Sequence, residues 1–468
     1  MEKLCGMIGM ALSAYLTLEE RRDLCKKSQS FDYRMQTPAT PVQGLFVNSQ
    51  AQDLLARETG DVFGNAVWLD QSVKDVLQLK LSPTKDLPSH GEMTDPFLAE
   101  TFDSIEKEGD GLRSYVGICL SLLLAIRPVT LIDEPELCLH PPQAVHMGRF
   151  IGQHSKENHV TFVATHSSHV LRGILETGRK VTVIRLSRSR KEFNATLVTE
   201  AELVNKLRNP RTRAESILDG MFSKAVVLVE SEGDREEYQA AAEAIEDYPA
   251  TEISFVPVGG TGGFAEPLRF YQMLRIPVAI VSDLDLICDA DKMRCLVAYL
   301  CQDDVRLREI EQTHREIMNN IKALPPTITE QEAKSTLSSL AQQEWDWHHD
   351  GDNILRRELN QLEGRLKRVR RLKEGGIEAY REYPHIYEQL QRLVSEAASI
   401  GLFLVPVGEL EAWVTHLTAA VPKNNVSKSD RAALVADLIR EARDKSGDIW
   451  SFIASVVNHI RRSIAVGS

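Results

Sequence analysis

Two apolar runs end in side chains that could act on a nucleoside triphosphate. Residues 129–132 precede Asp133 and Glu134, and residues 160–164 are soon followed by His166. Ligands of open α/β sheets gather at the carboxyl ends of the strands, so these side chains stand where a nucleotide could bind. There an aspartate can hold the nucleotide's magnesium, a glutamate can orient the attacking water, and a histidine can donate to the γ-phosphate. The alternative is that two buried strands end in solvated polar residues.

A segment with two glycines lies upstream, at the expected N-terminus of a helix. Its sequence is Glu108-Gly109-Asp110-Gly111-Leu112-Arg113-Ser114, and unpaired backbone N–H groups at such a terminus attract anions. With the turn Leu139-His140-Pro141-Pro142, these pieces resemble the ATP-binding cassette (ABC) superfamily: a signature loop at 109–114, a Walker B strand at 129–134, a D-loop at 139–142 and a switch histidine. The resemblance implies that Glu134 is catalytic and that the nucleotide is bound by Gly109, Gly111, Ser114, Asp133, Glu134 and His166.

The phosphate-binding loop of that superfamily, G-x-x-x-x-G-K-[ST], does not occur in the 468 residues. The nearest segment, Gly-Gly-Thr-Gly-Gly at 259–263, has no lysine and lies outside the ATPase half. The chain therefore resembles the second half of such an ATPase. We expect ATP to bind only when a partner supplies this Walker A lobe, and we expect a homo-oligomer or such a chain as the protein partner.

Four further acids follow two other apolar runs. Glu230 ends the run 225–229, Asp234 begins the next helix, and Asp283 and Asp285 end the run that starts at residue 276. Side chains two apart on a strand point the same way, so the last two should face one side of the sheet. Such carboxylates could hold Mg²⁺ or Mn²⁺, and a pair of these ions could clamp the attacking and leaving oxygens of a phosphodiester. The alternative is that they are solvated acids at helix starts, where the helix dipole favours them.

The order of these strands resembles the TOPRIM fold of topoisomerases, primases and certain nucleases. A later strand end, Gly408-Glu409-Leu410-Glu411, offers a further ligand, Glu411, with Glu409 as the runner-up. An ABC-type half followed by TOPRIM resembles the overcoming-lysogenization-defect (OLD) family of ATP-dependent endonucleases, over about residues 40–415. Thr261 stands where that pattern has a lysine. The resemblance implies DNA cleavage with catalytic residues Glu230, Asp283 and Asp285, and metal ligands Glu230, Asp234, Asp283, Asp285 and Glu411.

The fold class expected is α/β, with the C-terminal part of an ABC-type ATPase domain followed by a TOPRIM domain that carries a helical insertion. The expected domains are a partial ATPase domain at 1–210, a first TOPRIM part at 220–302, a helical insertion at 303–400, and TOPRIM completion with C-terminal helices at 401–468. Three finer expectations accompany these boundaries. Residues 1–29 form one helix, residues 181–186 form a strand of the parallel sheet, and the insertion stays off the TOPRIM core.

The amino-acid composition restricts the binding partners and the cellular compartment that we expect for this protein. The net charge of −12 disfavours a passive coat on nucleic acid, which needs positive charge, but permits an enzyme with one basic face. Seven cysteines without a C-x-x-C pair indicate a reducing, cytoplasmic setting. No apolar run reaches the ~18 residues that span a bilayer, so no membrane partner is expected. Basic clusters at 185–191 and 365–373, and Lys423 with Lys428, are candidate DNA contacts.

The leading functional hypothesis is a metal-dependent DNA endonuclease regulated by an ATPase module, with phage defence as a setting. A second hypothesis is a non-catalytic, nucleotide-gated binding subunit of a defence complex. A third is an N-terminally truncated fragment without ATPase activity. The complete set of TOPRIM acids favours the first, whereas the absent phosphate loop favours the others for ATP chemistry.

Overall fold

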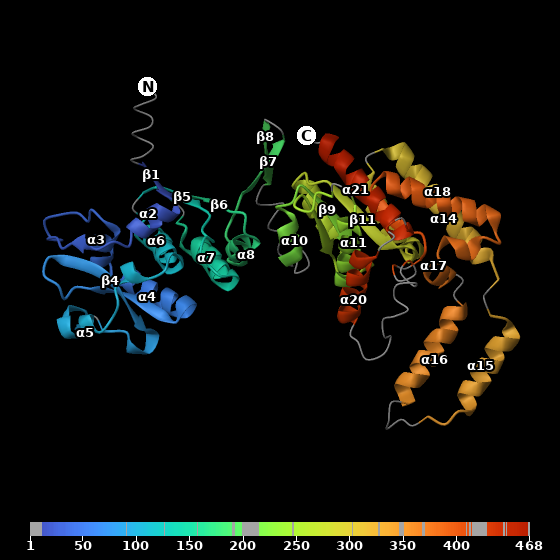
Figure 1. The fold of residues 1–468 in the computed structure, drawn as a ribbon, viewed down its shortest axis with the longest axis horizontal. Helices are drawn as coiled ribbons and strands as arrows, with labels where there is room; N and C mark the ends of the chain where they lie inside the picture. Colours follow the sequence, from blue (N-terminus) through green and yellow to red (C-terminus); the bar gives the residue numbers. More distant parts are fainter. Residues whose placement is uncertain are drawn as a thin grey trace. The chain divides into compact units, whose positions relative to one another are not determined.

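The computed structural model describes residues 12–466 except 90, 126, 157, 190–191, 199–214, 246–247, 302, 326–327, 346–350, 367–369, 409, 411–412, 414–427, 443–444 and 446. It divides into two compact units, the first containing the elements from β1 to α8 and the second those from β7 onward. Both units combine helices with parallel strands, which confirms the expected α/β class (Figure 1).

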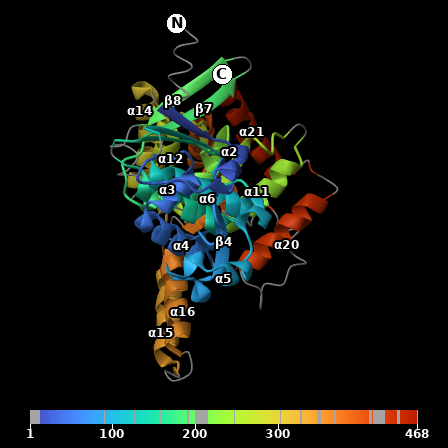
Figure 2. The same cartoon turned by 90° about the vertical axis from the view of Figure 1, so that its left-hand side faces the viewer.

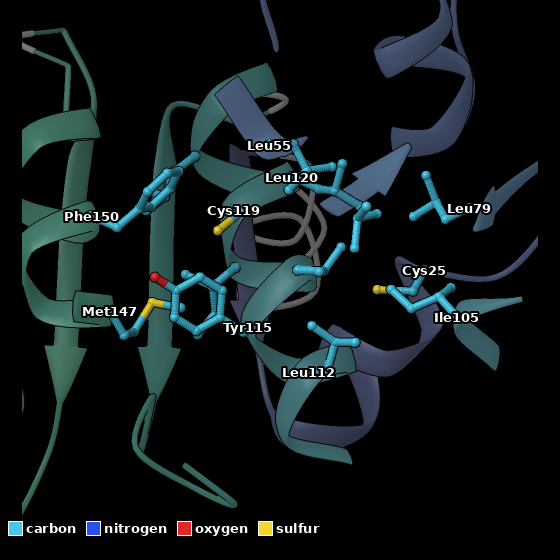
Figure 3. Packing of buried hydrophobic residues seen from close by; sticks show 14 of the residues in the cluster. Cys25, Leu55, Leu79, Ile105, Leu112, Tyr115, Cys119, Leu120, Met147 and Phe150 are labelled. Carbon is cyan, nitrogen blue, oxygen red and sulfur yellow. The ribbon is translucent and has the colours of Figure 1, made fainter. Parts of the chain in front are cut away.

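The elements of the first unit are β1 (Ser13–Leu16), α2 (Leu18–Asp23), β2 (Ser28–Gln29), α3 (Pro41–Phe46), α4 (Ser49–Phe63), β3 (Asn65–Asp70), β4 (Val76–Pro83), α5 (Pro96–Glu100), α6 (Asp110–Leu124), β5 (Val129–Asp133), α7 (Pro141–His154), β6 (Val160–Ala164) and α8 (Ser168–Glu176). A parallel sheet has the order β1-β5-β6, and an antiparallel sheet has the order β2-β4-β3. Helix α6 is almost wholly apolar and lies in the core, where Tyr115 and Cys119 pack near Met147 and Phe150 of α7 (Figure 3).

The expectation of one helix over residues 1–29 is wrong for the described part of that segment. Residues 13–16 form β1, which pairs in parallel with β5, so that Ser13 lies opposite Val129 and Leu16 opposite Ile132. Leu16 is thereby buried in the core, together with Cys25. Pairing with a distant strand outweighed the local helical periodicity, as tertiary context often does.

The elements of the second unit are β7 (Val183–Ser189), β8 (Glu192–Val198), α10 (Glu215–Gly220), β9 (Ala225–Val229), α11 (Glu232–Glu243), β10 (Ile253–Pro257), α12 (Ala265–Met273), β11 (Val278–Asp283), the 3-10 helix η5 (Leu284–Cys288), α13 (Ala290–Leu300), α14 (Asp304–Ala323), α15 (Glu330–Gln342), α16 (Gly351–Leu366), α17 (Arg370–Gly375), the 3-10 helix η6 (Ile377–Tyr380), α18 (Pro384–Ser399), β12 (Leu402–Val405), α20 (Lys428–Glu441) and α21 (Asp448–Val466). The expectation for residues 181–186 is wrong, because β7 pairs antiparallel with β8 in a separate two-stranded sheet.

A four-stranded parallel sheet, in the order β10-β9-β11-β12, forms the centre of the second unit. All five residues of β9 are buried, as is typical of a strand covered on both faces. Helices α11, α20 and α21 contribute Tyr238, Ile439 and Ile453 to the core beside this sheet. The carboxyl ends of β9 and β11 therefore lie next to each other at one edge.

The insertion is helical as expected, and its described residues contain no strand between 303 and 375. Helices α15 and α16 form an outlying hairpin, and α15 buries no residue (Figures 1 and 2). The expectation that the insertion stays off the TOPRIM core is wrong for α14 and α18. Ile317 and Ile321 of α14, and Leu390 and Leu393 of α18, are fully buried, and α18 packs on β12.

The helices of the described segments include none with the length and apolar character needed to cross a membrane.

Candidate functional site

Glu134 and His166 meet at the carboxyl ends of β5 and β6. Asp133, the last residue of β5, lies opposite Ala164, the last residue of β6. Glu134 has a φ of 46°, and its N–H donates to the Ala164 carbonyl at 2.8 Å. This turn directs the Glu134 carboxylate toward the imidazole, and Glu134 Oε1 lies 3.3 Å from His166 Nδ1. The two side chains on which the nucleotide hypothesis depends are thus neighbours in space.

Glu136 is a positioning residue that the sequence analysis missed. Its two carboxylate oxygens accept hydrogen bonds from Thr165 Oγ1 at 2.9 and 2.8 Å, and Oε1 also accepts from the backbone N–H of His166 at 3.2 Å. The same oxygen lies 3.2 Å from His166 Nδ1. Because the Glu136 side chain is only 11% exposed, it holds the histidine loop against the end of β5. The sequence feature that could have identified Glu136 is its position directly after Asp133-Glu134-Pro135.

Asp133 has a partner from the opposite edge of the sheet. Tyr15 of β1 donates its hydroxyl to Asp133 Oδ2 at 3.3 Å. The negative charge of this carboxylate raises the pKa of the Tyr15 phenol, because it disfavours the phenolate. A helix over residues 1–29 could not predict this contact, because the contact requires β1 to pair with β5.

Arg21 supports the same strand end from inside the protein. Its side chain is fully buried, and it donates to the backbone carbonyls of Asp133 at 3.1 Å, Glu134 at 3.3 Å and Thr17 at 3.1 Å. Burial lowers the pKa of the Arg21 guanidinium, and the nearby carboxylates, Asp133 first among them, oppose this shift. The guanidinium therefore fixes the backbone of both acidic residues through their carbonyl oxygens.

We expect Arg21→Met to destabilise the first unit. The change removes the side-chain donor of three partly buried carbonyls. The Thr17 and Glu134 carbonyls keep backbone donors, from Arg21 and Leu137, so the expected cost is about 1–3 kcal/mol of unfolding free energy. Urea denaturation followed by circular dichroism measures the effect. Arg22→Met is the matched control, because Arg22 is 36% exposed in its pair with Asp110 and should contribute about 1 kcal/mol or less. Equal losses in the two variants would contradict this role of Arg21.

The signature segment 109–114 is only partly placed as expected. Gly109 is the N-cap of α6, and nothing lies within 4 Å of where its Cβ would be, which leaves room for a ligand. Gly111 instead serves close packing, because a Cβ there would lie 2.4 Å from the Cys138 carbonyl oxygen. Ser114 is completely buried inside the unit. In the described part of this unit α6 turns Ser114 toward the core, so its expected contact with the nucleotide stays a prediction that this burial does not favour.

In the second unit, Glu230 and Asp283 are linked through Ser282. Ser282 Oγ donates to Glu230 Oε1 at 2.6 Å, and the backbone N–H of Asp283 donates to the same oxygen at 3.0 Å. Both of these bonds go to Oε1 of Glu230, and neither goes to its Oε2. The adjacent strands β9 and β11 thus bring two predicted ligands together at one sheet edge.

Asp234 and Asp285 lie around this pair. Asp234 forms a capping box at the start of α11, where its Oδ2 accepts from the Ser231 N–H at 2.9 Å. Asp285 does not continue the strand, because η5 begins at Leu284 and places it in the first turn. The argument from an extended Asp-x-Asp is therefore wrong in detail. Glu411 and its runner-up Glu409 lie outside the described residues, as do Lys423 and the side chain of Lys428.

The pKa of the Glu230 carboxyl depends on its burial and on the neighbouring acids. Burial raises the pKa of the Glu230 carboxyl above its ordinary value, and the bonds from Ser282 and Asp283 oppose this rise. The charges of Asp234 and Asp285 raise the pKa further. A cation at this edge would relieve the repulsion and favour the ionised form.

Lys373, from the helical insertion, also reaches this edge. Its Nζ lies 3.8 Å from Asp285 Oδ2, and its side chain is 51% exposed. Two glycines permit the approach: a Cβ on Gly408 would lie 2.4 Å from the Lys373 carbonyl oxygen, and one on Gly376 would lie 2.2 Å from the Pro406 carbonyl oxygen. Both glycines have positive φ, 100° and 58° respectively. The insertion therefore returns to the acids at a defined position.

A second lysine lies near the glycine-rich loop at 259–263. Thr261 occupies the position where the sequence pattern predicted a lysine, and Lys292 Nζ of α13 lies 3.4 Å from Thr261 Oγ1. Lys292 also pairs with Asp289 at 2.9 Å. A lysine of the neighbouring helix thus lies beside this loop, which local sequence could not indicate.

The four acids at the ends of β9 and β11 have the donor type that a hard cation prefers, although they do not complete its coordination shell. No three Asp, Glu, His or Cys side chains of the described segments converge closely enough to hold a metal ion by themselves. Mg²⁺ commonly takes one or two carboxylates and completes its shell with water and substrate phosphates. Glu230, Asp234, Asp283 and Asp285 supply only carboxylate oxygens, which is the donor type that Mg²⁺ and Mn²⁺ prefer.

Comparisons with known families distinguish the two units. Residues 221–285 match the TOPRIM domain described as overcoming lysogenization defect protein-like. Residues 37–172 match an AAA domain whose description refers to the AbiEii toxin and type IV TA systems. The chain thus combines a segment similar to AAA ATPase domains with a segment similar to OLD-like TOPRIM domains. The TOPRIM match contains Glu230, Asp234, Asp283 and Asp285, and the ATPase match contains Asp133, Glu134 and His166.

Solved structures add little to these two matches. A structure from work on ATP-driven dimerization and DNA-stimulated activation of SMC ATPases is 12% identical, with a TM-score of 0.24, covering 36% of this chain and 94% of that one. The SMC head bound to the C-winged helix domain of ScpA is 11% identical, with a TM-score of 0.28, covering 42% of this chain and 57% of that one. At these scores the likenesses carry no argument. No curated protein matches the chain significantly.

Proposed function

We propose that the chain is a DNA endonuclease that uses Mg²⁺ or Mn²⁺ at the TOPRIM acids and is regulated by its ATPase half. The observation that carries this proposal is the joint attachment of Glu230 and Asp283 at one sheet edge, through the Ser282 hydroxyl and the Asp283 N–H. DNA is the proposed substrate, and phage defence is a proposed setting. The proposed domains are 1–210, 220–302, 303–400 and 401–468, as expected from the sequence.

Each residue at the sheet edge where β9 and β11 end has its own proposed role in phosphodiester cleavage. Glu230, Asp234, Asp283 and Asp285 would hold the divalent metal, which when bound supplies Lewis acidity and activates water. Ser282 orients the Glu230 carboxylate through its short hydrogen bond. Lys373 offers a positive charge beside Asp285, where it can stabilise the negative charge that develops on the scissile phosphate.

The ATPase half offers only part of a nucleotide site. Asp133 would hold the magnesium of ATP, Glu134 would orient the attacking water, and His166 would contact the γ-phosphate. The 468 residues supply no phosphate loop for the other oxygens. ATP is therefore proposed to bind only with a partner that supplies this lobe.

Plasmid cleavage by the purified chain tests the nuclease. Supercoiled DNA is incubated with the protein and Mg²⁺ or Mn²⁺, and relaxed or linear products are separated on a gel. We expect cleavage with either metal and none when a chelator replaces it. Equal cleavage with and without the chelator would exclude a metal-dependent site.

We expect Lys373→Ala to slow DNA cleavage about ten- to hundredfold, because a charged contact to a phosphate contributes about 1.5–3 kcal/mol. Lys373→Arg should retain most of the activity, since it keeps the charge. Lys334→Ala is the control, because Lys334 is 72% exposed on α15 and pairs only locally with Glu330. Cleavage rates at saturating metal are compared. If Lys373→Ala and Lys334→Ala behave alike, Lys373 has no part in the reaction.

A second candidate function is a non-catalytic binding subunit gated by a nucleotide. It is favoured by the incomplete convergence of the acids in the described residues and by the absent phosphate loop. It predicts DNA binding in a gel-shift assay without cleavage under any divalent cation. The plasmid experiment therefore separates the two functions.

A further inference from the structure

Asp285 lies on the short 3-10 helix η5, so strand β11 does not by itself determine its position. η5 begins directly after β11, and Leu284, Leu286 and Ile287 of this helix are buried in the unit. The backbone N–H of Leu284 donates to the Gly408 carbonyl at 3.1 Å, which attaches the start of η5 to the turn after β12. The place of the Asp285 carboxylate therefore depends on the elements that hold η5.

The helical insertion contacts η5 through two of its helices. Helices α14 and α17 both pack against η5, whereas the hairpin of α15 and α16 between them extends away (Figure 1). Helix α17 provides Lys373, whose Nζ lies 3.8 Å from Asp285 Oδ2. Helix α14 provides His314, whose Nε2 lies 2.6 Å from the Ile287 carbonyl oxygen. The insertion thus contacts both the side chain of Asp285 and the backbone that follows it.

His314 is a buried polar side chain with a defined partner. It is 8% exposed and lies on the same face of α14 as the buried Ile310 and Ile317. A carbonyl oxygen can only accept, so His314 Nε2 carries the proton of the bond to Ile287. Carbonyls near the C-terminal end of a helix lack a donor within that helix, and Ile287 has such a place in η5. The imidazole therefore satisfies a buried carbonyl that would be costly to leave unpaired.

We propose that His314 is a positioning residue of the metal site: through the Ile287 carbonyl it holds η5, and so keeps the Asp285 carboxylate at the edge where β9 and β11 end. His314 positions and does not ligate, because its bond runs to the backbone of η5 and not to a carboxylate. The insertion thereby takes part in setting the affinity of the site for its cation. This inference rests on the metal site of the proposed function and adds to that site a residue from the insertion.

The binding of Mn²⁺ to the purified chain, measured by electron paramagnetic resonance, tests the proposal without DNA or ATP. His314→Phe keeps an aromatic ring but cannot donate, so we expect Mn²⁺ to bind about five- to tenfold more weakly. His314→Gln should bind Mn²⁺ within about twofold of the wild type, because its amide nitrogen can donate from the place of Nε2. Unchanged binding in His314→Phe, or an equal loss in His314→Gln, overturns the proposal.

A double-mutant cycle with Asp285→Ala separates positioning from general stabilisation of the fold. If His314 acts through Asp285, His314→Phe should weaken Mn²⁺ binding no further once Asp285 is replaced by alanine. Asn320→Ala is the matched control, because Asn320 lies on the same helix and donates to Gln389 of α18 and not to η5. Losses that add in the cycle, a loss in Asn320→Ala equal to that in His314→Phe, or no effect of Asp285→Ala overturns the proposal.

Two further variants keep the result unambiguous. If His314→Phe does not fold, His314→Asn takes its place, because its amide has the same chemistry as that of His314→Gln but is too short to reach η5. Glu230→Ala identifies the site, since the Mn²⁺ lost in this variant is the ion held where β9 and β11 end. If Glu230→Ala loses no Mn²⁺, the proposed metal site is wrong and this proposal fails with it. If the Mn²⁺ results are as expected but DNA is not cleaved, only the nuclease is overturned.

Discussion

Asp283→Ala and Glu230→Ala are each expected to abolish the metal-dependent cleavage of plasmid DNA while the chain stays folded. Each change removes an oxygen ligand at the edge where β9 and β11 end side by side. A bound metal supplies several kcal/mol of transition-state stabilisation, so the rate should fall about a thousandfold. Gel assays at several Mg²⁺ and Mn²⁺ concentrations measure the loss, and circular dichroism checks the fold.

Two further variants sharpen this experiment. Glu230→Gln retains the shape of the side chain and can still accept the hydrogen bond from Ser282, so its inactivity would be due to the lost charge. Asp291→Ala is the control, because Asp291 is an exposed acid in the first turn of α13. Wild-type cleavage by Asp283→Ala or Glu230→Ala would show that the metal site is wrongly assigned.

The purified chain alone is expected neither to bind ATP tightly nor to hydrolyse it. The 468 residues contain no G-x-x-x-x-G-K-[ST], and thus neither the N–H nest nor the lysine that binds the β- and γ-phosphates. Asp133 and Glu134 cannot replace them, because they serve the magnesium and the water. Equilibrium dialysis with labelled ATP and a phosphate-release assay measure both properties.

Hydrolysis should appear only when the loop-bearing lobe is present, and Glu134→Gln should then abolish it. His166→Ala should also lower the rate, since His166 lies beside Glu134. Magnesium-dependent turnover by the chain alone, lost in Glu134→Gln, would mean that the chain contains a phosphate-binding loop of another kind.

Sequence patterns predicted well the two strand ends that carry Glu230 and Asp283, because buried strands of parallel sheets are encoded locally. The buried run 225–229 became β9, and the run before Asp283 became β11, so the positions of Glu230 and Asp283 followed. The prediction weakened where the backbone changed direction. Asp285 was assigned to an extended strand, whereas a 3-10 helix begins at Leu284.

The first 29 residues show the limit of local pattern most clearly. Their spacing of apolar residues predicted a helix, yet residues 13–16 pair with β5, more than a hundred residues away in the chain. That pairing places Tyr15 beside Asp133. Arg21, a few residues further along the chain, then lies beneath the same strand end. No local propensity encodes a partner at such a distance.

By itself, the sequence determined the α/β class, the two sets of acids and the absence of a phosphate loop, because each is written in a short segment. Only the tertiary structure decided which other side chains lie beside these two sets of acids. Glu136 positions His166, Lys373 arrives from an insertion expected to stay apart, and Ser114 turns inward. Which groups join a site depends on packing between distant segments, and such packing leaves little trace in local sequence.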